Sequence, residues 1–273
     1  MDFDNTYRSG LEDWLSPIQT EHFLNTLHIN ARDVSLETLR TVIRAIYANI
    51  PFQNLTMLCR PAEPPTKQQI ISDMMKGMGG LCTTSNPFLC ALLQTMGFNA
   101  GLHIVSMEKP DCHIGLIVQL NEKKYFVDVG NGFPYLEPLE LKNNSQHRVL
   151  NFEYQLIQTG ESWAIQQTVL GSRKKIIDQT FSAKLCHYSA FTRMRKKHYT
   201  EVNYGPFLTS IRINLWSHQN GFMLRNKTVL NIPDTKYKLK NETEALLWLN
   251  TYLPKPEPLQ ALLKKSWRKI FDN

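Results

Sequence analysis

Apolar residues recur at helical spacing through the first third of the chain. Ser16 followed by Pro17 is typical of an N-cap and a first helical residue, and Ser35 is a second N-cap candidate. Pro51 and Gly77 are residue types that end helices. The pattern therefore predicts three helices, over residues 16–29, 35–50 and 66–77.

A fourth helix is predicted in "NPFLCALLQTMGF", residues 86–98, where apolar side chains again recur at helical spacing. Proline lacks a backbone N–H and is tolerated in a helix only in the first turn. Pro87 therefore predicts that this helix begins within a few residues of Cys82.

The pattern changes to that of short strands from about residue 98 onward. Asn-Glu, Asn-Gly and Thr-Gly pairs between the apolar stretches are typical of turns. We predict an antiparallel sheet or barrel built from the strands 99–107, 112–121, 123–132, 149–158 and 162–170.

The last part of the chain mixes both patterns. It predicts a helix over 241–253, opened by Asn241, after the strands 206–217, 221–232 and 236–240. The expected fold class is therefore α+β, with an N-terminal helical bundle at 1–97, a central antiparallel β-barrel at 98–200 and a C-terminal α/β part at 201–273.

Composition supports a folded protein in a reducing compartment. Of the 273 residues, 42% are hydrophobic and 20% are charged, which argues against disorder. The five cysteines, at 59, 82, 90, 112 and 186, are an odd number, and the N-terminus is polar and acidic. We expect a cytoplasmic protein with no membrane partner, since no window of 18 apolar residues occurs.

The net charge of +7 comes partly from the basic stretches 193–199 and 262–271. Such stretches are often solvated faces, and they also suit a small molecule that carries phosphates, or nucleic acid. No zinc finger, RNA-binding signature or heptad-linked basic region appears, so we expect no nucleic-acid partner.

Cys82 has the surroundings of a nucleophile. The N–H groups at the start of the following helix favour a thiolate. Gly79 and Gly80 allow a sharp turn that would leave the sulfur uncovered, and their amides are candidates to hold an oxyanion. The alternative is a packing role, which is the common role of cysteine and the one expected of Cys59, Cys90, Cys112 and Cys186.

His113 and Asp128 are polar residues within apolar strands, and burial requires them to have partners. If the two strands pair through the turn at "LNEKK", the carboxylate lies beside the imidazole and orients it. Cys82, His113 and Asp128 would then act as nucleophile, base and orienter. Each also has a simpler explanation, as a packed cysteine, a core histidine and a turn residue. No CxxC or HxxxH spacing predicts a metal site.

Four segments in this order resemble the arylamine N-acetyltransferase family: "IPFQNL" (50–55), "GGLC" (79–82), "CHIGLIV" (112–118) and "YFVDVGNG" (125–132). The resemblance implies a three-lobed, cysteine-protease-like fold, with a C-terminal lid and a catalytic triad of Cys82, His113 and Asp128. It also implies ping-pong transfer of an acetyl group from acetyl-CoA, as co-substrate and not as a tightly bound cofactor, to an arylamine, arylhydrazine or N-hydroxyarylamine.

The resemblance implies further site residues. Phe52, Asn131 and Phe133 match positions that line or shape the acceptor pocket. Gly132 matches a glycine near the acyl group, and Phe207 and Thr209 lie in "YGPFLTS" (204–210), which resembles a segment near the coenzyme A channel.

The chain departs from the family at three places. Gln53 and Met78 replace a Glu and an Arg that form an ion pair in the family; losing both charges together can be nearly neutral, whereas losing one strands the other. Before His113, Lys109, Pro110, Asp111 and Cys112 replace small residues that meet coenzyme A, which affects acyl-donor contacts.

Two other functions stay open from the sequence. An amide synthase of the same fold would keep the triad and take acyl groups from a carrier protein. A non-catalytic homologue would bind an aromatic ligand or nucleic acid, but it would have no reason to keep the triad. The oligomeric state, the preferred amine and the acyl donor are not indicated.

Overall fold

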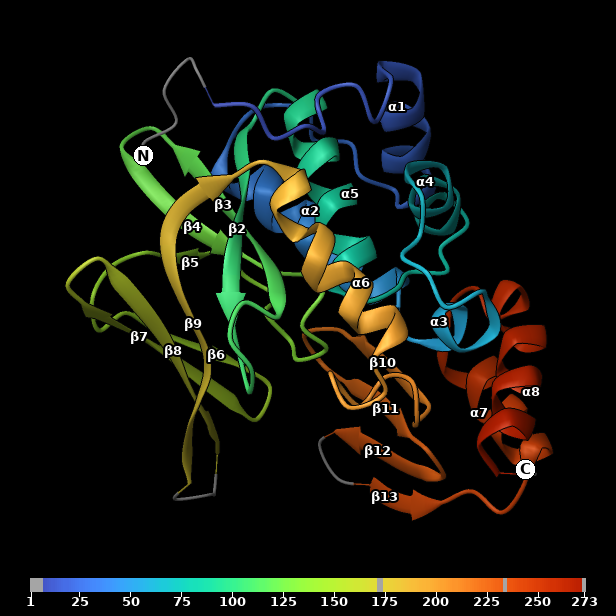
Figure 1. The fold of residues 1–273 in the computed structure, drawn as a ribbon. Coiled ribbons are helices and arrows are strands. Elements are labelled where there is room, and N and C mark those ends of the chain that lie inside the picture. The colour runs from blue at the N-terminus through green and yellow to red at the C-terminus, as the bar shows by residue number, and fades with distance from the viewer. Residues whose placement is uncertain (1–6, 171–173, 233–234, 272–273) are drawn as a thin grey trace.

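Five helices form the N-terminal part of the protein in this computed structural model, which describes residues 7–170, 174–232 and 235–271. Figure 1 shows them packed beside the strands of a barrel, with a second sheet and the C-terminal helices below. The helices are α1 (Pro17–Thr26), α2 (Leu36–Asn49), α3 (Leu55–Cys59), α4 (Lys67–Met75) and α5 (Cys82–Thr95).

Side-chain caps start the first two helices where the sequence predicts them. The Gln19 amide N–H donates to Ser16 Oγ, and the Ser16 N–H donates to Gln19 Oε1, which completes a capping box. The Thr38 N–H donates to Ser35 Oγ at 3.2 Å. The prediction of α1 and α2 is confirmed, and α4 lies within the third predicted range.

Helix α5 begins at Cys82 itself, with Leu81 as the N-cap residue. The predicted start near Cys82 is confirmed. The assumption that Pro87 lies in the first turn is wrong, because Pro87 is the sixth residue of the helix. A proline there leaves the carbonyl of Thr83, four residues earlier, without its usual helical donor.

Eight antiparallel strands form the central barrel, in the order β5-β4-β3-β2-β9-β8-β7-β6. The edge strands β5 and β6 are joined by only residues 141–145, so the sheet curls until it is nearly closed. The strands are β2 (Asn99–Ser106), β3 (His113–Leu120), β4 (Lys123–Val127), β5 (Leu139–Glu140), β6 (Gln146–Val149), β7 (Phe152–Thr159), β8 (Ser162–Val169) and β9 (Lys175–Cys186).

Strand β9 is missing from the sequence prediction, although it connects β2 to β8. Its alternation is broken, since its register shifts against both neighbours. Two of its polar residues, Asp178 and Gln179, are buried against the site described below. A strand with a polar interior face does not give the alternation by which strands are usually recognised.

A second sheet has the order β1-β10-β11-β12-β13, and its first strand, β1 (Phe52–Gln53), comes from the helical part of the chain. The predicted strand 221–232 is wrong, because it is a hairpin of β11 (Gly221–Arg225) and β12 (Thr228–Ile232). Asn226 adopts a φ of 55° in the two-residue turn, as asparagine does in hairpins. The other strands are β10 (Arg212–Trp216) and β13 (Thr235–Lys238).

Three helices and a short helical turn complete the fold. The predicted helix 241–253 is confirmed as α7 (Glu242–Tyr252), in which Asn241 Oδ1 accepts from the Glu244 N–H. The basic stretches, for which no helix was predicted, lie in α6 (Thr192–Thr200), preceded by the 3₁₀ turn η1 (Tyr188–Phe191), and in α8 (Glu257–Phe271).

Two hydrophobic clusters hold these parts together. The larger joins α1, α2 and α5 to the barrel, and the smaller joins β10–β12 to α3, α7 and α8. The predicted fold class, α+β with a helical part, an antiparallel barrel and a C-terminal α/β part, is confirmed. Within the described ranges no helix has the length and apolar character to cross a bilayer.

Candidate active site

Cys82 is the first residue of α5, the helix that packs against strands β2 and β3 of the barrel. A Cβ on Gly130 would lie 2.4 Å from the Cys82 Cα, so the backbone of the loop after β4 packs directly on the cysteine. Gly79 has a φ of +67°, and a Cβ there would meet the Pro51 carbonyl oxygen at 1.9 Å. The expectation that the glycines leave the sulfur uncovered is wrong, because Cys82 is only 5% exposed.

His113 and Asp128 come together as the strand pairing predicts. The β3–β4 hairpin turns at Asn121, which has a φ of 55°, and Asp128 follows directly after β4. His113 Nε2 lies 2.8 Å from Asp128 Oδ2, and both side chains are almost fully buried. Cys82 also lies close enough to the imidazole to raise its pKa, and Nδ1 is the ring nitrogen that does not bind Asp128. The three predicted residues therefore form one cluster.

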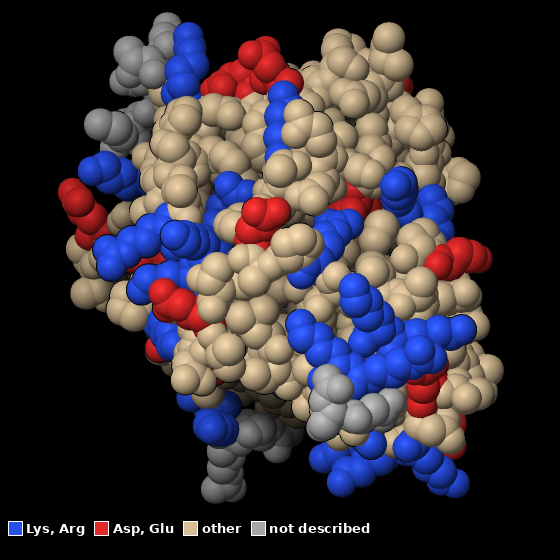
Figure 2. Space-filling view, turned by 45° about the vertical axis from the view of Figure 1, so that its right-hand side comes forward, with Lys and Arg blue, Asp and Glu red and all other residues tan. Residues whose placement is uncertain are grey.

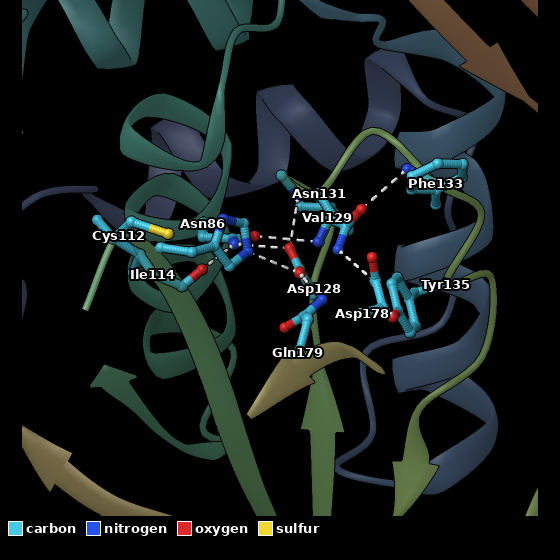
Figure 3. Close-up of polar contacts among 12 residues, drawn as sticks. Asn86, Cys112, Ile114, Asp128, Val129, Asn131, Phe133, Tyr135, Asp178 and Gln179 are labelled. Atoms are coloured by element: carbon cyan, nitrogen blue, oxygen red, sulfur yellow. Dashed lines mark hydrogen bonds and ion pairs between the residues drawn. The ribbon is translucent and has the colours of Figure 1, made fainter. Parts of the chain in front are cut away.

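Asp128 is held by four donors, two on each carboxylate oxygen. Asn86 Nδ2 and the Gly130 N–H donate to Oδ1 at 2.8 and 2.9 Å, and Gln179 Nε2 donates to Oδ2 at 3.0 Å beside His113. Figure 3 shows these groups converging on the carboxylate from different elements. A buried carboxylate with four donors is fixed in position and stays ionised.

Burial and charge act in opposite directions on this pair. Burial lowers the pKa of His113, but the charges of Asp128 and Cys82 and the hydrogen bonds with them raise that pKa well above its ordinary value. Burial raises the pKa of Asp128, but the His113 charge and the hydrogen bonds from His113, Asn86 and Gly130 hold it below its ordinary value. The geometry therefore favours a protonated His113 imidazole beside an ionised Asp128 carboxylate.

Asn86 is a site residue that the sequence reasoning missed. Its amide nitrogen also donates to the Ile114 carbonyl at 2.5 Å, and its Oδ1 accepts from the Val129 N–H at 3.0 Å. It therefore fixes the strand that carries His113 against the loop that carries Asp128. The signal was present: a polar residue at i+4 from Cys82 lies on the same face of the helix.

Asp178 forms a second buried acidic position beneath the same loop. Tyr135 Oη and Asn131 Nδ2 donate to its Oδ2 at 2.6 and 3.1 Å. Burial raises the pKa of Asp178 above its ordinary value. The predicted acceptor residue Asn131 is thus engaged with the barrel, and its Oδ1 accepts from the Phe133 N–H, so it shapes the loop that follows Asp128.

Of the other predicted substrate residues, three lie together and two lie elsewhere. A Cβ on Gly132 would lie 3.1 Å from the Phe52 ring, and that ring meets Phe207 edge to face with centroids 6.1 Å apart. Phe133 instead packs against Phe152 of the barrel. Thr209 is exposed on the surface.

Gln53 and Met78 are both accommodated without charge. Gln53 Nε2 donates to Thr56 Oγ1 and the Gly79 carbonyl at 3.3 and 3.2 Å, and its Oε1 accepts from the Thr56 N–H. Met78 packs in the cluster that contains Leu55. A neutral amide can donate and accept at once, so it suits a buried position that has no cationic neighbour.

The loop before His113 is tied to the segment that follows α6. Lys109 Nζ donates to the Asn203 carbonyl and lies 5.2 Å from the centre of the Tyr204 ring. His198 lies 2.7 Å, through Nε2, from the Cys112 carbonyl oxygen and packs edge-on against Tyr204. The residues that replace the family's small ones therefore fasten this loop to its neighbour.

Much of the positive charge lies away from this cluster. Figure 2 shows Lys and Arg side chains gathered over the region of α8 and the neighbouring hairpin. Lys265 and Lys269 donate to the carbonyls of Cys59 and Leu58 at the end of α3, so two of these cations have a structural use. In the part of the chain that is described, no three His, Cys, Asp or Glu side chains are grouped to hold a metal ion.

Residues 35–252 match a protein family described as N-acetyltransferase, so the chain belongs to that family. The arylamine N-acetyltransferase of Escherichia coli strain K12 is 30% identical over 162 residues, which cover 56% of this chain and 57% of that protein. The chain thus matches little more than half the length of this curated relative.

Solved structures with the same fold carry the same name. The arylamine N-acetyltransferase of Nocardia farcinica superposes with a TM-score of 0.78 at 23% identity, over 97% of this chain and 99% of that one. The Mycobacterium marinum enzyme in complex with CoA gives 0.80 at 18% identity, over 92% and 99%. The resemblance to the arylamine N-acetyltransferase family is confirmed.

Proposed function

We propose that this protein is an arylamine N-acetyltransferase, which transfers an acetyl group from acetyl-CoA through a Cys82 thioester to an arylamine, arylhydrazine or N-hydroxyarylamine. The observation that carries the proposal is the buried cluster in which the helix-terminal Cys82 meets an imidazole held by a four-donor carboxylate. This arrangement supplies a nucleophile, a proton carrier and an orienter.

In the first half-reaction the Cys82 thiolate attacks the carbonyl carbon of acetyl-CoA. The new C–S bond forms on Cys82, the C–S bond to coenzyme A breaks, and the departing sulfur takes the proton from His113. Asp128 holds the imidazole through Nε2, so the proton would be delivered from Nδ1, the ring nitrogen that does not bind Asp128. The free N–H groups of the first helical turn favour the thiolate before attack.

In the second half-reaction the amine attacks the thioester carbonyl and gives a proton to neutral His113. The amide C–N bond forms, the C–S bond to Cys82 breaks, and the thiolate returns beside a protonated imidazole. The low exposure of Cys82 supports this order of steps, because a thioester that is shielded from water is protected from hydrolysis until an amine binds.

We also propose roles for the surrounding residues. Phe52 would line the acceptor pocket with Phe133, while Asn131 would act through the loop that it holds. Gly132, Phe207 and Thr209 would lie along the acyl-donor path. The grouping of Phe52, Gly132 and Phe207 supports a shared aromatic wall.

The remaining proposals concern organisation and location. We propose three parts, with the nucleophile in 1–97, the base and its orienter in 98–200 and the lid in 201–273. A cytoplasmic location is supported by the five cysteines, all of which are free.

The test is acetyl transfer from acetyl-CoA to a panel of arylamines and hydrazines. The wild type should acetylate members of the panel, and Cys82→Ala should show no transfer above the uncatalysed rate. Cys90→Ala is the matched control, because this cysteine is buried within the same helix and packs in its core. Turnover retained by Cys82→Ala would contradict the proposal. Acyl transfer from a carrier-protein thioester, without transfer from acetyl-CoA, would indicate an amide synthase instead.

A further inference from the structure

Two arginines face each other across the second sheet. Arg212 of β10 is the direct partner of Arg225 of β11 in the antiparallel register. Both side chains are half-buried. Like charges placed directly opposite each other destabilise a sheet, so this pair has a cost that burial increases.

Both arginines point toward the candidate active site. Ile213, next to Arg212, packs into the cluster with α7 and α8 on the far side of the sheet. Asn214 and Trp216 are on the opposite face and donate to the Gly132 carbonyl at 2.8 and 2.9 Å. Because side chains alternate along a strand, Arg212 shares the face of these two residues, and its cross-strand partner shares it too.

Contacts place Arg225 next to the loop that follows Asp128. Its guanidinium lies 5.8 Å from the centre of the Phe133 ring. Arg212 Nε donates to Ser210 Oγ at 3.1 Å, close to the segment that contains Phe207 and Thr209. The pair therefore lies at the outer wall of the predicted acceptor region.

Neither guanidinium group forms an ion pair with a residue that the structure describes. By contrast, Arg60 and Arg44 bind Asp73 and Glu137 at 2.6 and 2.5 Å. Burial lowers the pKa of both, and for Arg212 the charge of Arg225 lowers it further while Glu108 only partly offsets this.

We propose that Arg212 and Arg225 recognise a carboxylate carried by the acyl acceptor. This inference rests on the proposed function and names its substrate class: aromatic amines or hydrazines that bear an acidic group on the side of the ring away from the nitrogen. Two guanidinium groups offer paired donors that match the two oxygens of a carboxylate. The position of Arg225 over Phe133 places this charge beside the acceptor loop.

The test compares 4-aminobenzoate with the neutral, similarly shaped 4-aminobenzamide. Arg225→Gln and Arg212→Gln should each lower kcat/KM for the acid about tenfold to a hundredfold, since hydrogen bonds to charged groups have about this effect. The same variants should change kcat/KM for the amide less than twofold. Arg268→Gln removes the same charge from the exposed face of α8 and should leave both acceptors unaffected.

Stability provides a readout that does not depend on turnover. Removing one of two facing like charges should raise the melting temperature of Arg225→Gln or leave it unchanged, which separates recognition from misfolding. The product of acetyl transfer to 4-aminobenzoate, 4-acetamidobenzoate, should raise the melting temperature of the wild type, and it should fail to raise that of Arg225→Gln.

Three results would overturn the inference. An equal loss of kcat/KM for the acid and the amide would mean that the arginines do not recognise the carboxylate of the acceptor. An effect confined to the KM for acetyl-CoA would mean the same, and it would indicate that the arginines bind the phosphates of the donor. In both cases the proposed function would still hold. Absence of acetyl transfer to either acceptor by the wild type would overturn the proposed function together with the inference.

Discussion

Among the residues that the structure describes, charged side chains are paired on the barrel side of the candidate active site and unpaired on the side of the second sheet. On the barrel side, Asp128 has four donors and the His113 imidazole lies between it and Cys82. On the side of the second sheet, Arg212 and Arg225 face each other with no carboxylate partner in the described residues. Both walls are held to the same loop, residues 128–133.

This difference indicates that the two sides have different roles, catalysis and selection of the acceptor. Groups that take part in bond making need fixed positions and fixed protonation, which complete hydrogen bonding supplies. Groups that select a substrate need unmet bonding capacity, which the substrate then satisfies. We therefore expect the barrel wall to set the chemistry and the opposite wall to set which acceptor is used.

The largest effect should follow from removing the charge at the barrel wall. Asp128→Asn keeps the size of the side chain but loses the carboxylate that stabilises the imidazolium, and we expect kcat/KM to fall about 10²- to 10⁴-fold. Steady-state kinetics with one arylamine would measure this. Asp13→Asn is the control, because it makes the same change on an exposed residue outside the candidate active site. Equal losses in the two variants would contradict the assigned role.

A charge introduced at Gln53 of β1, beside the turn that precedes Cys82, should be costly for stability. Gln53→Glu would place a carboxylate against the Gly79 carbonyl in a fully buried site, and we expect a loss of about 3 kcal/mol in the free energy of unfolding. Adding Met78→Arg should recover part of that loss. Denaturant unfolding of the two single variants and the double variant measures the coupling.

The control for that cycle is Gln158→Glu, the same change at an exposed position of the barrel, which should alter stability little. If Gln53→Glu were equally harmless, the buried turn before Cys82 would tolerate an unpaired charge. An unpaired charge, such as those of Arg212 and Arg225 in the described structure, would then not distinguish the surroundings of the acceptor from those of the nucleophile.

A smaller effect should appear in the pH dependence of stability. The pKa of His113 is raised above its ordinary value of 6.5, so its protonated form stabilises the fold fully below pH 6.5 and progressively less as the pH rises through the folded-state pKa. The difference in melting temperature between the wild type and His113→Gln should therefore shrink steadily above pH 6.5. A difference that grows with pH would contradict the imidazolium assignment.

The parts of the site that the sequence predicts are those with local signals. Cys82 stands between glycines and a helix, and His113 and Asp128 stand out as polar residues in two strands that a short turn joins. Gln179 has no such signal, because its contact with Asp128 depends on β9, whose register shifts relative to both neighbouring strands. The arginine pair depends on the register between β10 and β11, which no local pattern in the sequence specifies.

The central claim is that Cys82 carries the acetyl group, and mass spectrometry of the protein after incubation with acetyl-CoA tests it most directly. We predict one acetyl group on the peptide that contains Cys82, removed again when an arylamine is added. Burial makes Cys90 and Cys186 poor nucleophiles by raising their pKa, that of Cys186 to about 12, so these two should stay unmodified. Absence of the adduct, or acetylation spread over several cysteines, would contradict the account.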